Sequence, residues 1–440
     1  MAITIREFGV LTATGASCGL DAQCLADADF ALLKQEALAG QPYLSLISRA
    51  GNECVRVGSH VGVITLSTGT QIEVLPKMTE GEQGADRARG LLLKMLTTVM
   101  DIPFRESGMA SLNTARRPWL QSLIDFVLGE FATFLRGGLR SHYQQTRASL
   151  TSVKGKLDVA AQIQQRPGNE TRFQVCYDEY TPDRPENRLL KSALLKLLRW
   201  SETLDNNRKA RELLYYLDAV PASGNTKRDL QAWKEGREMQ RYRVIKPWVA
   251  LILENRLPFV SQGEHQGLSL LFPMERLYEA YLGKVLKGGL PAGLQLREQI
   301  SRHYLAGQGG QGWFRLCPDL AILRGNTPVC ILDAKWKLLD SSLDNGRDKY
   351  GLSQADFYQL FAYGHRYLPP GGHLFLIYPK TERFNEPLPV FDLQGYWLHV
   401  VPFCLEQETL VLPDGAAIED FVIEPAFTVK EWAEGGSMAP

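Results

Sequence analysis

Hydrophobic and polar residues alternate along the first part of the chain. Between residues 55 and 78 the sequence VRVGSHVGVITLSTGTQIEVLPKM alternates on both sides of Thr68, which is typical of two strands joined by a turn. A helical period interrupts this alternation once, around residues 26–37. Residues 1–78 are therefore predicted to form a mostly β segment with one short helix.

A helical period dominates after a polar, glycine-containing linker at residues 77–89. Between Pro118, which suits the first turn of a helix, and Gly137, apolar residues recur every three or four positions. The same period returns in ENRLLKSALLKLLRW at residues 186–200 and in RKARELLYYLDAV at residues 208–220. The middle of the chain is therefore predicted to be helical.

One stretch of this helical part, residues 150–180, has a different pattern. Apolar residues alternate with more polar ones over residues 155–163, a Pro-Gly-Asn turn follows at 167–169, and alternation returns over 173–177. These features predict a long β-hairpin whose arms would reach roughly 30 Å at about 3.3 Å per residue. From the pattern alone, the hairpin either protrudes as a finger or adds two strands to a sheet.

The last part of the chain alternates between helix and strand. The predicted order is a helix at 271–286, strands that include a hairpin at 317–337, a helix at 353–368, a strand at 373–379 and further strands to Phe403. The whole chain thus predicts a multidomain α+β protein. Its three predicted domains are a β-rich one at 1–85, a helical one with the hairpin at 86–262, and a C-terminal α/β core with a mixed sheet at 263–440.

The balance of charge argues against a general attraction to nucleic acid. The 440 residues are enough for two or three cores, and 49 basic residues offset 49 acidic ones. Any contact with nucleic acid must therefore come from a local patch. One candidate is residues 226–248, where seven Lys or Arg outnumber three acidic residues among interleaved aromatics. A solvated helix face with charge pairs explains that stretch equally well.

Cysteine usage and hydropathy bear on the compartment. The seven cysteines are dispersed and form no C-x-x-C pair, which favours a reducing compartment and argues against a zinc site or a disulfide framework. The start, MAITIREFGVL, lacks the basic and apolar regions of a signal peptide. No apolar run approaches the roughly 20 residues that span a bilayer. We therefore expect a cytoplasmic protein with no membrane partner.

Three charged residues stand inside the apolar strands of CPDLAILRGNTPVCILDAKWK, residues 317–337. Ionised groups are costly to desolvate, so charges in such strands are usually paired, metal-bound or functional. A turn centred near Asn326 places Asp319 across from Asp333, with Cβ atoms roughly 4.5 to 5.5 Å apart. Lys335 lies two residues beyond Asp333, so both side chains point to the same face of the sheet.

This set of charges has a chemical interpretation. Two carboxylates so close repel each other unless a cation lies between them, and oxygen ligands favour Mg²⁺ or Mn²⁺. A lysine beside the metal could hold or deprotonate a water. Together these groups predict metal-assisted hydrolysis of a phosphodiester. For an isolated D-x-K, a solvent-facing strand end is the commoner explanation; the matching Pro318-Asp319 favours a site.

The order of helix, hairpin, helix and strand, with Pro318-Asp319 and Asp333-Ala334-Lys335 on the hairpin, resembles the PD-(D/E)XK nuclease core. The following helix contains QADFY, residues 354–358, which resembles the Q-x-x-x-Y element of the RecB-like branch. A second copy at residues 359–363 leaves the register open. Gln and Tyr four residues apart also occur on ordinary amphipathic helices.

A wider likeness covers most of the chain from about residue 55 to 405. VGVITLSTGTQIEVLPKM, the segment from KGKLD through YDEYTPDRPENRLLKSAL, KPW, GLSLLFPMERLYEAY, LDAKWK and SQADFYQLFAYG, in that order, resemble the McrC family. The resemblance implies the nuclease subunit of a McrBC-type, modification-dependent restriction system. In such systems the partner, McrB, is a hexameric AAA+ GTPase ring that recognises methylated cytosine in DNA, and McrC stimulates it. The chain has no G-x-x-x-x-G-K-[ST] phosphate loop, which agrees with that division.

The resemblance also assigns roles to individual residues. It implies that Asp319 and Asp333 ligate Mg²⁺ together with the carbonyl of Ala334, and that Lys335 positions the attacking water. Such cores often carry a glutamate on the preceding helix.

Two residues on that preceding helix are candidates, and we favour Glu275 over Glu279, while a solvent-facing carboxylate is an equally good explanation of either. Gln354 and Tyr358 would support the scissile phosphate or orient Lys335. The hairpin at about 150–180 would enter the pore of the partner ring as a finger.

The expected function is a Mg²⁺-dependent DNA endonuclease subunit, with Mn²⁺ able to substitute, that cleaves double-stranded DNA with a modified cytosine when bound to its GTPase ring. One alternative is a PD-(D/E)XK nuclease that acts alone in repair or recombination. A second is a non-catalytic activator of the ring, against which the intact set of two aspartates and a lysine argues.

Overall fold

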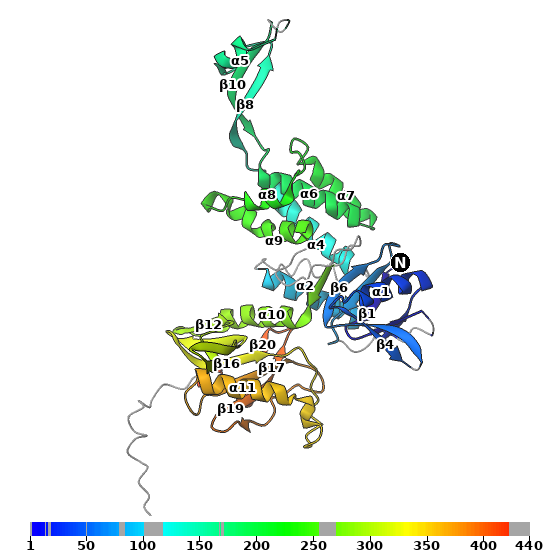
Figure 1. Ribbon diagram of the computed structural model, residues 1–440, viewed down its shortest axis with the longest axis vertical. Helices are drawn as coiled ribbons and strands as arrows, with labels where there is room; N and C mark the ends of the chain where they lie inside the picture. Colours follow the sequence, from blue (N-terminus) through cyan, green and yellow to red (C-terminus); the bar gives the residue numbers. More distant parts are fainter. Residues whose placement is uncertain are drawn as a thin grey trace, which may run out of the picture. The chain divides into compact units, whose positions relative to one another are not determined.

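The computed structural model describes residues 2–13, 15, 19–49, 51–78, 84–100, 118–166, 168, 171–254 and 270–421 (Figure 1). It has several sheets and many helices, so the predicted multidomain α+β class is confirmed. Contacts divide the chain into two compact units, residues 1–116 with 261–440, and residues 117–260. In the described part, no helix has the length and hydropathy needed to cross a bilayer.

The N-terminal segment is β-rich, as its alternation predicted. Its elements are β1 (Ala2–Arg6), β2 (Val10–Thr12), β3 (Ala22–Cys24), α1 (Asp27–Leu38), β4 (Leu44–Arg49), β5 (Asn52–Val57), β6 (His60–Thr65) and β7 (Gln71–Leu75). The predicted helix is α1, and the predicted turn at Thr68 joins β6 to β7. Buried apolar residues, among them Ile5, Val55 and Ile72, form the core of this segment.

A strand from much later in the chain completes one N-terminal sheet. β11 (Leu270–Pro273) pairs antiparallel with β6, which gives the order β1-β7-β6-β11. Gly62 of β6 makes this pairing possible, because a Cβ there would lie 2.0 Å from the carbonyl oxygen of Leu270. Its φ of +129° also favours glycine. The N-terminal segment and the last part of the chain thus share a sheet within one unit.

Helix α2 (Gly84–Val99) adds a second connection inside this unit. It packs against α10 (Met274–Gly289), and Lys94 Nζ donates 2.9 Å to the carbonyl of Glu406. The predicted linker at 77–89 is therefore helical from Gly84 on, and residues 79–83 lie outside the described part. The predicted boundary near 262 also falls outside it, so the division into three domains stays a prediction.

The second unit is mainly helical. Its helices are α4 (Trp119–Arg136), α6 (Pro185–Trp200), α7 (Leu204–Tyr215), α8 (Thr226–Gln231), η1 (Arg237–Met239) and α9 (Gln240–Glu254). The basic stretch at 226–248 is thus divided between three elements. Arg241 donates 2.6 Å to the carbonyl of Gly137, and Lys246 Nζ lies 2.5 Å from Glu235. These contacts favour the structural explanation of its charges over a nucleic-acid patch.

The predicted hairpin of this unit is a separate sheet of its own. β8 (His142–Leu150), β9 (Lys156–Leu157) and β10 (Phe173–Thr181) pair in the order β8-β10-β9, with α5 (Val159–Ile163) between β9 and β10. Figure 1 shows it extending away from α6 and α8. Among the described residues the three strands form a sheet of their own and add no strand to another sheet.

The outgoing arm of the finger differs from the prediction. Residues 155–163 were expected to be the first long strand, but β8 takes that place and pairs with β10 from His142 opposite Thr181 to Leu150 opposite Phe173. Asp158 caps α5 by accepting a hydrogen bond of 3.1 Å from the Ala161 N–H, and the alanines that follow favour a helix.

The last part of the chain forms a mixed seven-stranded sheet. Its elements are α10, β12 (Leu294–Glu298), β13 (His303–Gln308), β14 (Gln311–Leu316), β15 (Leu320–Arg324), β16 (Thr327–Ala334), η2 (Lys349–Gly351), α11 (Gln354–Tyr367), β17 (His373–Pro379), β18 (Phe391–Asp392), β19 (Trp397–Cys404), β20 (Thr409–Leu410), η3 (Pro413–Gly415) and η4 (Ile418–Phe421). The order is β12-β15-β16-β17-β19-β18, with β20 on β19, and β16, β17 and β19 run parallel.

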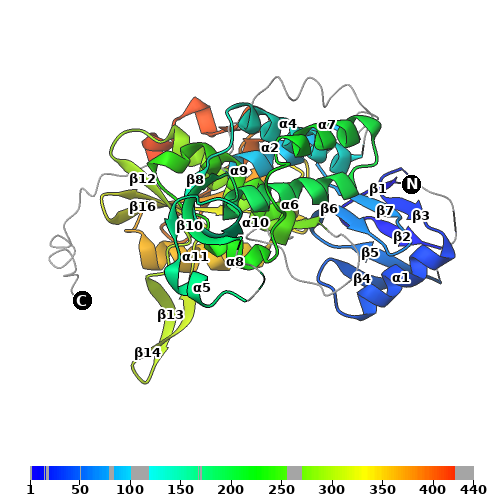
Figure 2. The same ribbon diagram turned by 90° about the horizontal axis from the view of Figure 1, so that it is seen from above.

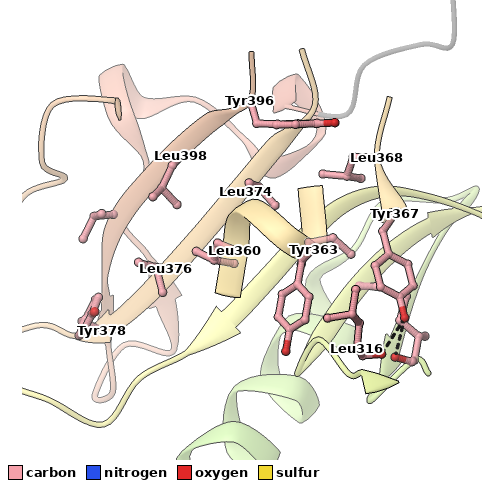
Figure 3. Packing of buried hydrophobic residues seen from close by; sticks show 14 of the residues in the cluster. Leu316, Leu360, Tyr363, Tyr367, Leu368, Leu374, Leu376, Tyr378, Tyr396 and Leu398 are labelled. Carbon is pink, nitrogen blue, oxygen red and sulfur yellow. Dashed lines mark hydrogen bonds between the residues drawn. The ribbon is translucent and has the colours of Figure 1, made fainter. Parts of the chain in front are cut away.

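Two helices flank this sheet. In Figure 1 the sheet lies between α10 and α11. The buried cluster under α11 includes Leu360, Tyr363, Tyr367, Leu374, Leu376 and Leu398 (Figure 3). Because this packing fixes the rotation of α11 about its axis, it decides which polar residues of the helix face the edge of the sheet where β15 begins and β16 ends.

Candidate active site

The hairpin of β15 and β16 brings the two predicted aspartates together. It turns at Gly325, whose φ of +62° favours glycine, and an irregularity in the pairing then shifts the register by one residue. As a result Leu320 pairs with Leu332. Asp319 precedes that pair and Asp333 follows it, so the two carboxylates lie on opposite strands at the same level, as predicted.

Asp333 is fully buried, with 0% of its surface exposed. Burial, followed by repulsion from Asp319, raises its pKa to about 7. Its Oδ2 atom lies 2.6 Å from Lys335 Nζ. Apart from this ion pair, neither carboxylate oxygen has a hydrogen-bond partner among the described residues. A buried carboxylate with so few donors is costly unless it binds a cation or a proton.

Asp319 lies at the start of β15 and is linked directly to the opposite strand. Its Oδ2 atom accepts a hydrogen bond of 2.9 Å from the Ala334 N–H. Burial, followed by the charge of Glu279, raises its pKa to about 6. The two aspartates therefore repel each other in a poorly solvated place, which is the electrostatic condition of a cation site.

Lys335 connects the aspartates to α11. Its Nζ atom lies 3.8 Å from Asp356 Oδ1 and donates 3.3 Å to Gln359 Oε1. Burial disfavours its charge, but the surrounding carboxylates, Asp333 first, outweigh that effect and raise its pKa. Lys335 is thus a charged donor in the metal-free site, which favours holding a water over deprotonating it.

The second copy of the Q-x-x-x-Y pattern faces the site. Gln359 contacts Lys335 and donates 2.7 Å to the Tyr363 hydroxyl, which in turn donates 3.0 Å to the carbonyl of Cys317, two residues before Asp319. Residues five positions apart on a helix point about 140° apart, so both copies cannot face the same place.

The first copy, which the sequence analysis favoured, is not brought to the aspartates. Gln354 Nε2 donates 2.6 Å to the Tyr358 hydroxyl, and the Tyr358 side chain is 65% exposed. In the described part of the chain, neither residue forms a hydrogen bond with Asp319, Asp333 or Lys335. Packing of α11 therefore brings the copy at 359–363 to Lys335, and the copy at 354–358 faces away from it.

The choice between the two glutamates of α10 also changes. Glu279 is half-buried, accepts 3.0 Å from Gln299 Nε2, and has a pKa raised by burial and by charges that include Asp333. Glu275 is exposed, and its carboxylate favours the charged form of Lys77, away from the aspartates. The geometry therefore supports Glu279 as the third carboxylate beside the aspartates, against our preference for Glu275.

Asp356 is a site residue that sequence reasoning missed. It lies near Lys335, and Tyr378 of β17 donates 3.4 Å to its Oδ2 atom. Asp356 precedes Gln359 by three residues, so the two share a face of α11. That spacing was readable in the sequence and would have found Asp356 had the second copy of Q-x-x-x-Y been preferred.

The residues present fit a hard divalent cation. In the residues that the structure describes, no three His, Cys, Asp or Glu side chains are grouped as ready metal ligands. The two aspartates nevertheless supply the oxygen donors that Mg²⁺ prefers, and Lys335 is the sole described partner of the Asp333 oxygens. A bound ion can take further ligands from water, as Mg²⁺ usually does.

Comparisons with known proteins agree on one family. A family described as "McrBC 5-methylcytosine restriction system component" matches residues 55–379. The chain is 23% identical over 334 residues to the type IV methyl-directed restriction enzyme EcoKMcrBC of Escherichia coli K12, covering 70% of this chain and 92% of the relative.

A solved structure extends this likeness to the fold. The chain is similar, with a TM-score of 0.69 and 17% identity, to a chain in a refined half-complex from a tetradecameric assembly of Thermococcus gammatolerans McrB AAA+ hexamers with bound McrC. The similarity covers 94% of this chain and 97% of that one. Since the family match spans most of its length, the chain belongs to the McrBC 5-methylcytosine restriction system components.

Proposed function

We propose that the chain is the nuclease subunit of a McrBC-type restriction system, a Mg²⁺-dependent endonuclease that acts when bound to an AAA+ GTPase ring. The observation that carries the proposal is the convergence of Asp319, Asp333 and Lys335 at one edge of a mixed sheet. That set, on a hairpin flanked by α10 and α11, supports a PD-(D/E)XK core. Membership of the McrBC family supports a role in restriction.

Asp319 and Asp333 would hold Mg²⁺, or Mn²⁺ in its place, with the carbonyl of Ala334 as a further ligand. When bound, the ion supplies charge that polarises a phosphate and lowers the pKa of a coordinated water. Lys335, charged and positioned by Asp333 and Gln359, donates a hydrogen bond to the attacking water or to a phosphate oxygen.

The residues around Lys335 would set its position. Tyr363 links Gln359 to the carbonyl of Cys317, so the helix side and the strand side of the site are connected. Glu279 extends the carboxylate cluster from α10. Fixed neighbours of this kind orient a catalytic group before the substrate arrives, which lowers the entropic part of the barrier.

The finger is the proposed contact with the GTPase ring. Its sheet pairs with no other described strand. Several of its large apolar side chains are exposed to solvent, which is a feature of interaction surfaces. Tyr143 and Tyr180, whose ring centroids are 5.0 Å apart, are two of them. The likeness to the Thermococcus gammatolerans assembly, in which McrC is bound to McrB AAA+ hexamers, supports a ring as the partner.

The proposal extends to the substrate and the compartment. The family description names 5-methylcytosine, so we infer double-stranded DNA with a modified cytosine as the substrate. The six described cysteines are all free, which favours the cytoplasm.

The proposal is tested with matched methylated and unmethylated plasmids, Mg²⁺, and the chain with and without its partner GTPase and GTP. We expect cleavage of methylated DNA only, and only with partner and GTP. Cleavage by the chain alone would support a solitary nuclease and overturn the restriction mechanism. Tyr143→Ala with Tyr180→Ala tests the finger, because undiminished stimulation of the partner's GTPase would contradict its role.

A further inference from the structure

A second hairpin stands beside the candidate site and has no part in the proposed chemistry. Among the described strands, β13 and β14 pair only with each other, and Figure 2 shows them projecting from the rest of their unit. Every residue of the two strands except Leu316 is exposed. Ribbons of two exposed strands are marginal on their own, so this one depends on the contacts at its base.

The base of the hairpin is firmly held by α11. The Tyr367 hydroxyl donates 2.9 Å to the carbonyl of Leu316 (Figure 3) and accepts 3.2 Å from the Arg302 N–H. The His303 ring packs edge-on against Tyr367, with centroids 4.7 Å apart. Both strands are therefore anchored at the end that lies next to the site.

The hairpin leads directly into the candidate site. Asp319 follows Leu316 by three residues, which limits their separation to about 10 Å. A ribbon of six-residue strands extends roughly 20 Å from that point. Anything bound along it therefore lies next to the bond that the aspartates and Lys335 would cleave.

The charge of the hairpin is positive and unneutralised. Residues 299–318 include no Asp or Glu but contain Arg302 and Arg315. Arg302 donates to Asn326, and Arg315 donates 3.4 Å to the carbonyl of Ser301. Within the described ranges, no carboxylate forms an ion pair with either guanidinium. Fixed cations without anionic partners, beside a phosphodiesterase site, complement a nucleic-acid backbone.

The outer part of the hairpin exposes aromatic side chains in a strained backbone. Phe314 is 72% exposed and has a φ of +56°, a conformation that costs a bulky residue about 1 kcal/mol or more. Trp313 beside it is 48% exposed. The Tyr304 ring occupies the space where a Cβ of residue 312 would be, which only Gly312 allows. Strain that presents a large apolar side chain to solvent is a feature of binding surfaces.

We infer that the β13–β14 hairpin binds the DNA duplex beside the scissile phosphodiester, with Arg302 and Arg315 on phosphates and Trp313 and Phe314 against bases or sugars. A two-stranded ribbon fits a major groove of about 12 Å, where apolar side chains such as Phe can contact the methyl group of thymine. The inference rests on the proposed nuclease function and adds a substrate-contacting element to it.

The test measures binding of a fluorescent duplex to the full-length chain in Ca²⁺, alone and with its partner. Phe314→Ala is expected to weaken binding about tenfold, the size of a lost aromatic contact with a base. Arg315→Gln is expected to reduce the salt dependence, with a slope lower by about 1. Trp397→Ala and Arg383→Gln are matched controls, because Trp397 is 46% exposed and Arg383 is paired with Asp340.

The outcomes separate the two claims. Unchanged DNA binding in both hairpin variants, or no DNA binding by the wild-type chain in either assay, overturns the inference. So does a loss of partner association without a loss of DNA binding, which would make the hairpin a protein interface. If Asp333→Asn fails to reduce cleavage, the proposed function fails while the binding result on the hairpin still stands.

Discussion

Trp336 Nε1 donates a hydrogen bond of 2.6 Å to Glu7 Oε1, joining two residues that are 329 positions apart. Glu7 is 2% exposed and also accepts 3.0 Å from the Lys77 N–H, while Lys77 Nζ donates 3.0 Å to the carbonyl of Trp336. Trp336 follows Lys335 directly. The N-terminal β segment, whose role the sequence left open, thus holds the backbone next to Lys335, the lysine of the proposed site.

We predict that Glu7→Ala lowers the cleavage rate about tenfold and destabilises the chain by about 1–3 kcal/mol, because the Trp336 donor loses a buried acceptor. Glu7→Gln keeps an acceptor and should have a smaller effect. Thermal unfolding and plasmid cleavage measure the two effects separately. Wild-type cleavage by Glu7→Ala would show that the N-terminal segment does not position Lys335.

The two Gln-Tyr pairs of α11 provide an internally controlled prediction. Gln359→Ala removes the acceptor that orients Lys335, so cleavage should fall by about tenfold to a hundredfold, within the range of positioning effects. Gln354→Ala, on the same helix but bonded only to exposed Tyr358, should cleave at the wild-type rate. Initial cleavage rates at saturating DNA distinguish the two variants. A larger loss with Gln354→Ala than with Gln359→Ala would show that the pair at 354–358, and not the pair at 359–363, supports the site.

The two glutamates of α10 give a second matched pair. Glu279→Gln removes one negative charge beside Asp319 and Asp333, so apparent affinity for Mg²⁺ should fall by a few-fold to tenfold. Glu275→Gln should leave that affinity unchanged, since Glu275 is exposed. Titration of cleavage against Mg²⁺ concentration measures both. Equal effects of the two substitutions would remove Glu279 from the site.

The metal-free site should couple stability to pH. In the folded chain, burial and the charge of Glu279 raise the pKa of Asp319 to about 6, and burial and repulsion from Asp319 raise that of Asp333 to about 7, so protons favour folding there. This contribution is fully present below the unfolded pKa of about 4 and is lost as pH rises through 6 and 7. Mg²⁺ should therefore raise the melting temperature by several degrees at pH 8 and much less at pH 5.5.

Unfolding of the EDTA-treated chain, with and without added Mg²⁺, measures this coupling at the two pH values. Asp333→Asn should abolish the difference, because the amide does not titrate and the site loses one of the two carboxylates that would hold the ion. An equal gain from Mg²⁺ at both pH values would contradict the assignment of these aspartates as the cation site.

The sequence predicted the geometry of the β15–β16 hairpin because that geometry depends on local rules. Strand alternation and turn position placed Asp319, Asp333 and Lys335 together. The turn is centred between residues 325 and 326 and not on Asn326, but the one-residue shift in the pairing of β15 with β16 corrects for this difference. Asp319 and Asp333 therefore lie at the same level, as predicted. The α11 register was not accessible in this way. Two Gln-Tyr copies fit one helix, and only packing of Leu360 and Tyr363 on the sheet decides which one faces inward.

Long-range features were also beyond the sequence. The first arm of the finger, HYQQTRASL, is polar on both faces because it is solvated on both, so it has no alternation to detect. The contact of Glu7 with Trp336 depends on how two sheets of one unit meet. No spacing rule connects residues so far apart in the chain.

The most direct test of the central claim is the cleavage rate of methylated plasmid by Asp333→Asn, in the presence of partner, GTP and Mg²⁺. The matched control is Asp340→Asn, which removes a carboxylate paired with Arg383 away from the cluster. We predict a loss of at least about a hundredfold for Asp333→Asn, with GTPase stimulation and folding retained, and wild-type cleavage by the control. Cleavage by Asp333→Asn at the wild-type rate would contradict the proposed active site.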